Sequence, residues 1–212
     1  MQSFSVYVEF DVADVSPDTY PDLFDALQDQ HGAVGPADSG NLSARLTIEA
    51  GSALQAAALG IEHTQNAITA HGITQPAVAV EVVTEAERDR RLTDEDQEEG
   101  PGPATAGAGE PCGQFSVYVE FDTTDVSVDT YTRLLAPLHD AHGAAGPAPN
   151  GNLSVRLTMQ AGSIMQAAMV GVHRAQATTT VNGLAPTVIG IKARVTAEHD
   201  RLPMEESQDE KV

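Results

Sequence analysis

The sequence predicts an α+β protein built by tandem duplication of a ferredoxin-like βαββαβ domain, an antiparallel sheet with two helices on one face. One observation is an internal repeat: residues 4–11, which read FSVYVEFD, recur unchanged as residues 115–122. A constant offset of 111 residues aligns residues 4–90 with residues 115–201 without a gap, and roughly half of the aligned positions are identical. The other observation is that apolar spacing switches between period two and the helical period in the same order in both copies. Because duplication converts a symmetric homodimer into one chain, we expect an intrachain pseudo-dimer.

The first strand and the first helix follow from the spacing of apolar residues. Apolar and polar residues alternate over residues 4–11, which predicts a strand with one buried face. Beyond it, apolar residues fall at i, i+3, i+4 and i+7, which places them on one side of a helix. They are Tyr20, Leu23, Phe24 and Leu27 in the first copy, and Tyr131, Leu134, Leu135 and Leu138 in the second.

A hairpin should follow the first helix. Residues 33–38 can form a short strand, and the interruption by Gly35-Pro36 suits a sheet edge. This strand is the weakest element, since without it the unit would be βαβαβ. Asn150-Gly151, where the first copy has Ser39-Gly40, is a strong signal for a two-residue hairpin turn. Alternating residues 42–49 then form the next strand.

The remaining elements are a second helix, a last strand and a short helix. Ser52 and Gln55 form a capping box that begins the second helix. Residues 78–82 alternate as a strand, and Thr84 with Glu87 form a second capping box over residues 84–92.

Composition divides the chain into two domains and two connecting or terminal segments. We expect repeat 1 at residues 1–92 and repeat 2 at residues 114–202. Residues 93–113 are acidic and rich in Pro, Gly and Ala, which is typical of a flexible linker. Residues 203–212 have the composition of a disordered acidic tail.

The net charge of −20 is spread unevenly between the copies. Residues 1–92 contain 14 acidic and 4 basic residues, whereas residues 114–202 contain 7 and 6. Because phosphate binding needs clustered Lys and Arg, direct binding to nucleic acid or to an anionic membrane is disfavoured. A basic protein partner suits the acidic first copy.

The chain reads as a cytoplasmic protein. It shows no secretory signal pattern and no apolar run that approaches the ~18 residues of a membrane span. A single cysteine, Cys112, excludes an intrachain disulfide. The composition, rich in Ala, Asp, Val and Thr, suggests a GC-rich bacterial genome, and the motifs point to no known family.

Six polar or aromatic residues form the candidate ligand site, on the sheet face that the helices leave open. They are Tyr7, Glu9 and Arg45 in the first copy and Tyr118, Glu120 and Arg156 in the second. Central neighbouring strands bring these residue types together, and the planar guanidinium of Arg suits a carboxylate or phosphate. The simpler interpretation is a cross-strand ion pair between Glu9 and Arg45 on a half-wet surface.

Catalytic, metal and cofactor sites are not predicted. Aspartates 11, 14 and 18 recur in the second copy, but their spacing differs from a calcium-binding loop and helix capping already explains them. His63 and His71 are eight residues apart on one helix, and the second copy has Arg174 and Asn182 there.

Three functions fit these features. The favoured one is a non-enzymatic protein-interaction or regulatory module in which the second repeat is the intrachain partner of the first. The alternative is an enzyme or sensor that binds a small molecule in a polar pocket between two facing sheets. The third is an acidic mimic of nucleic acid. The relative placement of the two copies, face to face or edge to edge, separates the first two.

Overall fold

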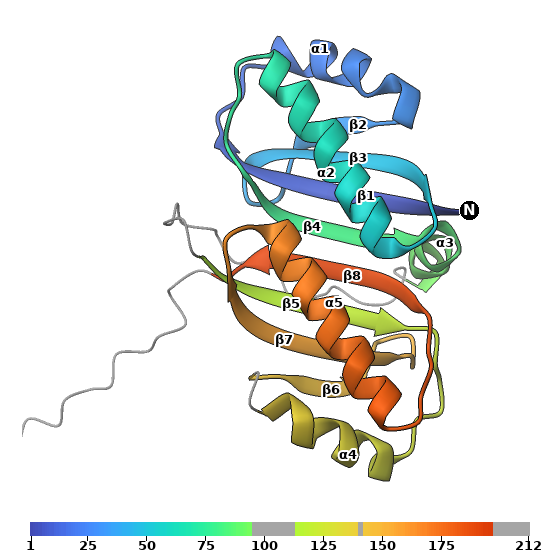
Figure 1. Ribbon diagram of the computed structural model, residues 1–212. Coiled ribbons are helices and arrows are strands. Elements are labelled where there is room, and N and C mark those ends of the chain that lie inside the picture. Colours follow the sequence, from blue (N-terminus) through green and yellow to red (C-terminus); the bar gives the residue numbers. More distant parts are fainter. Residues whose placement is uncertain (95–112, 140–141, 197–212) are drawn as a thin grey trace, which may run out of the picture.

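The computed structural model describes residues 1–94, 113–139 and 142–196, and these form one antiparallel sheet of eight strands with five α-helices (Figure 1). The first half contains β1 (Gln2–Ala13), α1 (Thr19–Ala26), β2 (Ala33–Pro36), β3 (Asn41–Ala50), α2 (Ala53–Ala70), β4 (Ala77–Thr84) and α3 (Glu85–Asp94). The second half contains β5 (Gly113–Phe121), α4 (Val128–His139), β6 (Ala144–Pro147), β7 (Leu153–Ala161), α5 (Ile164–Val181) and β8 (Val188–Val195).

Both halves follow the predicted order β-α-β-β-α-β, and the short second strand is present in each as β2 and β6. The predicted terminal helix is also present: α3 begins after Thr84, whose Oγ1 accepts a hydrogen bond from the Glu87 N–H at 3.2 Å. Of the predicted linker, residues 95–112 lie outside the described residues, as does the predicted tail at residues 203–212.

The two halves join edge to edge, in the sheet order β2-β3-β1-β4-β8-β5-β7-β6. Strands β4 and β8 pair antiparallel at the centre, where Glu81 lies opposite Lys192. Because these two residues correspond under the offset of 111, the equivalent strands of the two halves pair symmetrically about this point. The facing-sheet arrangement, and the enclosed pocket expected from it, are therefore wrong.

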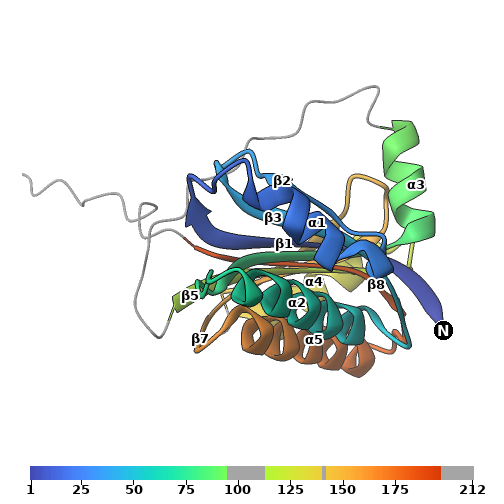
Figure 2. The same cartoon turned by 90° about the horizontal axis from the view of Figure 1, so that it is seen from above.

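One core runs under the whole sheet, in place of a separate core for each copy. Helices α2 and α5 lie side by side on the same face (Figure 2). Val82 and Ile191 pair across the junction between β4 and β8, and both belong to the same cluster of buried apolar residues. Because the sheet is continuous across the junction, the apolar side chains beneath it form one continuous core.

Each long helix approaches a central strand closely at a glycine. A Cβ at Gly60 of α2 would lie 2.5 Å from Val6 Cγ1, and one at Gly171 of α5 would lie 2.6 Å from Val117 Cγ1. Both valines are fully buried. The glycines therefore set the spacing between the helix layer and the sheet.

The substitutions Gly60→Ala and Gly171→Ala should each destabilise the protein by about 1–3 kcal/mol, because overpacking outweighs the helix propensity of alanine. Gly35→Ala is the control, since a Cβ there meets nothing within 4 Å. Urea denaturation measures the free energy of unfolding. Stabilisation by either helix substitution would contradict the tight packing.

Lys192→Glu should destabilise the junction by about 0.2–1 kcal/mol, because it places like charges opposite each other. Lys192 Nζ now lies 3.1 Å from Glu81 Oε2. Lys192→Met removes the attraction without adding repulsion, so it should cost less. The difference between the two variants, measured by denaturation, should shrink in high salt. An equal effect of both variants would show that charge at this point is unimportant.

Candidate functional site

The open face of the sheet carries a row of polar and aromatic side chains across its six central strands. The strand register places these residues directly beside one another, in the order Arg45, Tyr7, Glu81, Lys192, Tyr118 and Arg156. The row reads the same from either end, except that Glu81 at its centre faces Lys192. Four of the six predicted site residues therefore lie in one line, but the two arginines are at opposite ends and do not meet at one ligand.

In the first copy, the carboxylate of Glu9 is held by residues of its own repeat. One oxygen accepts hydrogen bonds from Ser39 Oγ at 2.6 Å and Asn41 Nδ2 at 2.9 Å, and the other accepts one from the Tyr7 hydroxyl at 3.4 Å. Burial and the nearby Glu9 charge raise the pKa of Tyr7, so this hydroxyl stays protonated at neutral pH.

The predicted ion pair between Glu9 and Arg45 is absent from the described residues. Arg45 instead lies opposite Tyr7, with its guanidinium carbon 5.3 Å from the centre of the ring, and Nη1 donates a hydrogen bond to Ser5 Oγ at 3.2 Å. The prediction failed because Glu9 lies two residues along β1, opposite Ser43.

In the second copy, the corresponding carboxylate of Glu120 is buried and is contacted by Arg91 of α3, which belongs to the first half of the chain. Arg91 Nη2 lies 2.6 Å from Glu120 Oε2, and the amide groups of Asn150 and Asn152 donate to Oε1. Burial raises the pKa of Tyr118, and the nearby Glu120 charge raises it further.

Glu87 fastens α3 to this face. One of its oxygens accepts hydrogen bonds from Arg91 Nε at 2.9 Å and from Asn150 Nδ2 at 2.8 Å, and the other accepts two from Arg90. Although burial alone would raise it, these hydrogen bonds hold the pKa of Glu87 below its ordinary value. Burial opposes the charge of Arg91, but Glu87 and Glu120 raise the pKa of its guanidinium. The result is a charge cluster that joins the two halves on the open face.

Residues in and around the α3 contact correspond to different residue types in the other copy of the sequence. These pairs, 111 positions apart, are Val83 and Arg194, Thr84 and Val195, Arg91 and Leu202, and Ser39 and Asn150. Valine cannot supply the hydroxyl that caps α3, and leucine cannot pair with a carboxylate. Val83 is buried, whereas Arg194 is exposed. The two open faces have therefore diverged in chemistry.

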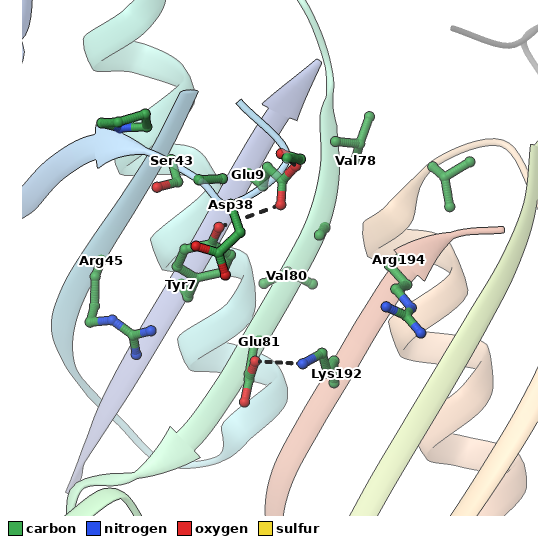
Figure 3. Close-up of a pocket in the computed structure, with 15 residues that line it drawn as sticks. Tyr7, Glu9, Asp38, Ser43, Arg45, Val78, Val80, Glu81, Lys192 and Arg194 are labelled. Carbon is green, nitrogen blue, oxygen red and sulfur yellow. Dashed lines mark hydrogen bonds and ion pairs between the residues drawn. The ribbon is translucent and has the colours of Figure 1, made fainter. Parts of the chain in front are cut away.

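A groove of about 410 Å³ lies on the open face of the first half and extends across the junction to β8 (Figure 3). Tyr7, Glu9 and Arg45 line it, together with Glu81, Lys192 and Arg194. A separate groove of about 300 Å³, next to Tyr118 and Arg156, lies beside β6. Sequence reasoning missed Glu81, Lys192 and Arg194, because their position depends on which edges of the two halves pair.

The described residues contain no group of three or more His, Cys, Asp and Glu side chains placed to hold a metal ion. Within the same part of the chain, no helix is long and apolar enough to cross a membrane.

Comparison with known proteins identifies no family. No protein-family model matches the chain, and no curated protein matches it. A solved structure described as an unknown protein from Galdieria sulphuraria is similar over 92% of this chain and 99% of its own, at 15% identity and a TM-score of 0.21. A similarity at this level carries no inference about function.

Glu87→Gln should destabilise the protein by about 1–3 kcal/mol at pH 7, since it leaves charged partners without their carboxylate. Because folding lowers the pKa of Glu87, its stabilising effect is present above the unfolded value and disappears as the pH falls through the folded value. The difference from the wild type should therefore shrink below about pH 4.5.

Arg88→Gln on the same helix is the control, because its pair with Glu85, at 3.6 Å, is partly exposed. Its effect should stay below about 1 kcal/mol. Denaturation from pH 7 to pH 3 measures both variants. A constant penalty for Glu87→Gln across this range would contradict the assigned role of its charge.

Proposed function

We propose that this protein is a non-enzymatic regulatory module made of two ferredoxin-like repeats fused as a pseudo-dimer, in which the first repeat binds a small ligand. The observation that carries the proposal is the contrast between the two open faces. In the second repeat, Arg91 of α3 pairs with the buried Glu120, and the groove beside β6 is smaller, at about 300 Å³. In the first repeat, the corresponding face contains the 410 Å³ groove, a volume in the range of small-molecule sites.

The chemistry of the groove favours binding over catalysis. Its described lining contains no histidine or cysteine. Glu9 is engaged by Ser39 and Asn41, and the raised pKa of Tyr7 makes its hydroxyl a poor base at neutral pH. These groups are suited to holding a ligand in place.

The sheet edges favour a site on the face. The outer strands β2 and β6 are four residues long, and each ends in a proline, Pro36 and Pro147. Short edge strands with proline discourage the addition of another strand. A basic protein partner for the acidic first repeat stays a separate prediction, which salt-dependent association would support.

Ala79→Trp tests the proposal, because Ala79 lines the groove and lies between Glu9 and Arg194 in the strand register. The melting temperature of the full chain is measured with a panel of organic acids, amines and neutral sugars. At least one class should raise it for the wild type and not for Ala79→Trp.

Ala144→Trp, at the groove of the second repeat, is the matched control and should respond as the wild type does. A panel without any stabilising compound, or stabilisation that survives Ala79→Trp, would overturn the proposal.

A further inference from the structure

We infer that the groove binds an elongated dicarboxylic acid, with one carboxylate at Arg194 and the other at Arg45. This inference rests on the proposed function and names its ligand class. It follows from which charged groups of the groove already have partners, from where the two arginines lie, and from how the two repeats differ.

Three acidic residues line the groove, and two of them, Glu81 and Glu9, have partners within the protein, whereas Asp38 is exposed. Glu81 pairs with Lys192 at 3.1 Å and with Arg91 at 3.5 Å. Glu9 accepts three side-chain hydrogen bonds. Glu81 is therefore paired with cations and Glu9 is satisfied by hydrogen bonds, so neither carboxylate needs a cation from the ligand.

The two arginines lack a carboxylate. Within the described residues, Arg45 makes no ion pair and contacts only a neutral hydroxyl and a ring, and Arg194 has no side-chain hydrogen bond or ion pair. Both side chains are exposed and line the groove (Figure 3). A guanidinium donates two parallel hydrogen bonds to a carboxylate, so each arginine offers a complete site for one acid group.

The spacing of the arginines calls for a ligand with two separated acid groups. Arg45 is on β3 and Arg194 on β8, and the sheet order puts β1 and β4 between them. Three strand spacings, together with the two-residue offset of Arg194 from Lys192 along β8, put their backbones roughly 16 Å apart. Tyr7, Val78 and Ala79 line the groove between them and offer apolar surface to a methylene chain.

The first repeat shows that the fold does not need an arginine at the position of Arg194. Val83, its counterpart in the first repeat, is buried just before α3, so an apolar residue fits there. An exposed arginine at the corresponding position adds a charge to the one groove that extends across the junction.

Isothermal titration of the full chain with succinate, adipate and suberate tests the inference, with propionate and hexanoate as acids of single charge. One site per chain should bind the dicarboxylate of suitable length at least about tenfold more tightly than either monocarboxylate, since its second carboxylate adds charged hydrogen bonds. The affinity should fall with added salt.

Arg194→Val, which installs the residue found at position 83, and Arg45→Ala should each weaken binding by about ten- to a hundredfold. Arg156→Ala is the matched control, because Arg156 corresponds to Arg45 but lies at the second groove, and it should change nothing. Unchanged melting temperatures in the absence of ligand show that the variants are folded.

The outcomes separate this inference from the proposed function. Binding of an amine or a sugar that Ala79→Trp removes, without dicarboxylate binding, would overturn the ligand class and leave the binding groove in place. Dicarboxylate binding that survives Arg194→Val and Arg45→Ala would overturn the assigned contacts. Equal affinity for monocarboxylates and dicarboxylates would overturn the two-ended mode.

Discussion

The pairing of β4 with β8 is the constraint on which the rest of the structure depends. It turns two four-stranded units into one sheet, brings α2 and α5 together beneath it, and extends the groove of the first half onto the second. Backbone hydrogen bonds supply the pairing, and the buried Val82 and Ile191 fix which face points toward the helices. A slip of one residue would expose those side chains and bury Glu81, so the register has little freedom.

The same junction explains the place of α3. Strand β4 runs parallel to β5, because both are antiparallel to β8, and it therefore ends near the end of β5, where Glu120 lies. Side chains of the helix that follows β4 can therefore reach Glu120 and Asn150 of the other repeat within two helical turns. Glu87 and Arg91 are four residues apart on one side of this helix. Arg91 pairs with both Glu87 and Glu120. Local helix geometry and the junction together create the contact.

Much of this arrangement was readable from the sequence, because repeated alternation and capping boxes are local signals. The short strand at Gly35-Pro36, the helix after Thr84 and the open-face position of Tyr7 and Arg45 follow from them. These local signals do not predict which edge strand of one repeat pairs with the other repeat. Both β2 and β4 lie at an edge of their four-stranded unit, and both carry apolar residues. For the same reason, the neighbours of Glu81 and Arg194 could not be predicted, because they depend on the pairing of β4 with β8. The expected contact of Glu9 with Arg45 failed on a register difference of two residues.

Joining the two halves in one chain allows asymmetry that a symmetric dimer forbids. At a two-fold axis between identical subunits, a residue meets its own copy, so position 81 would set two like charges together. In one chain, Glu81 meets Lys192 and the conflict becomes an attraction. The same freedom acts on the open faces, where Thr84 and Arg91 fasten a helix over one repeat, and Val195 and Leu202 lack the groups to do so. Once the two faces need not be alike, one can join the halves through the side chains of α3 while the other keeps the larger groove. The exposed Arg194, which lines that larger groove where its counterpart Val83 is buried, shows this difference most clearly.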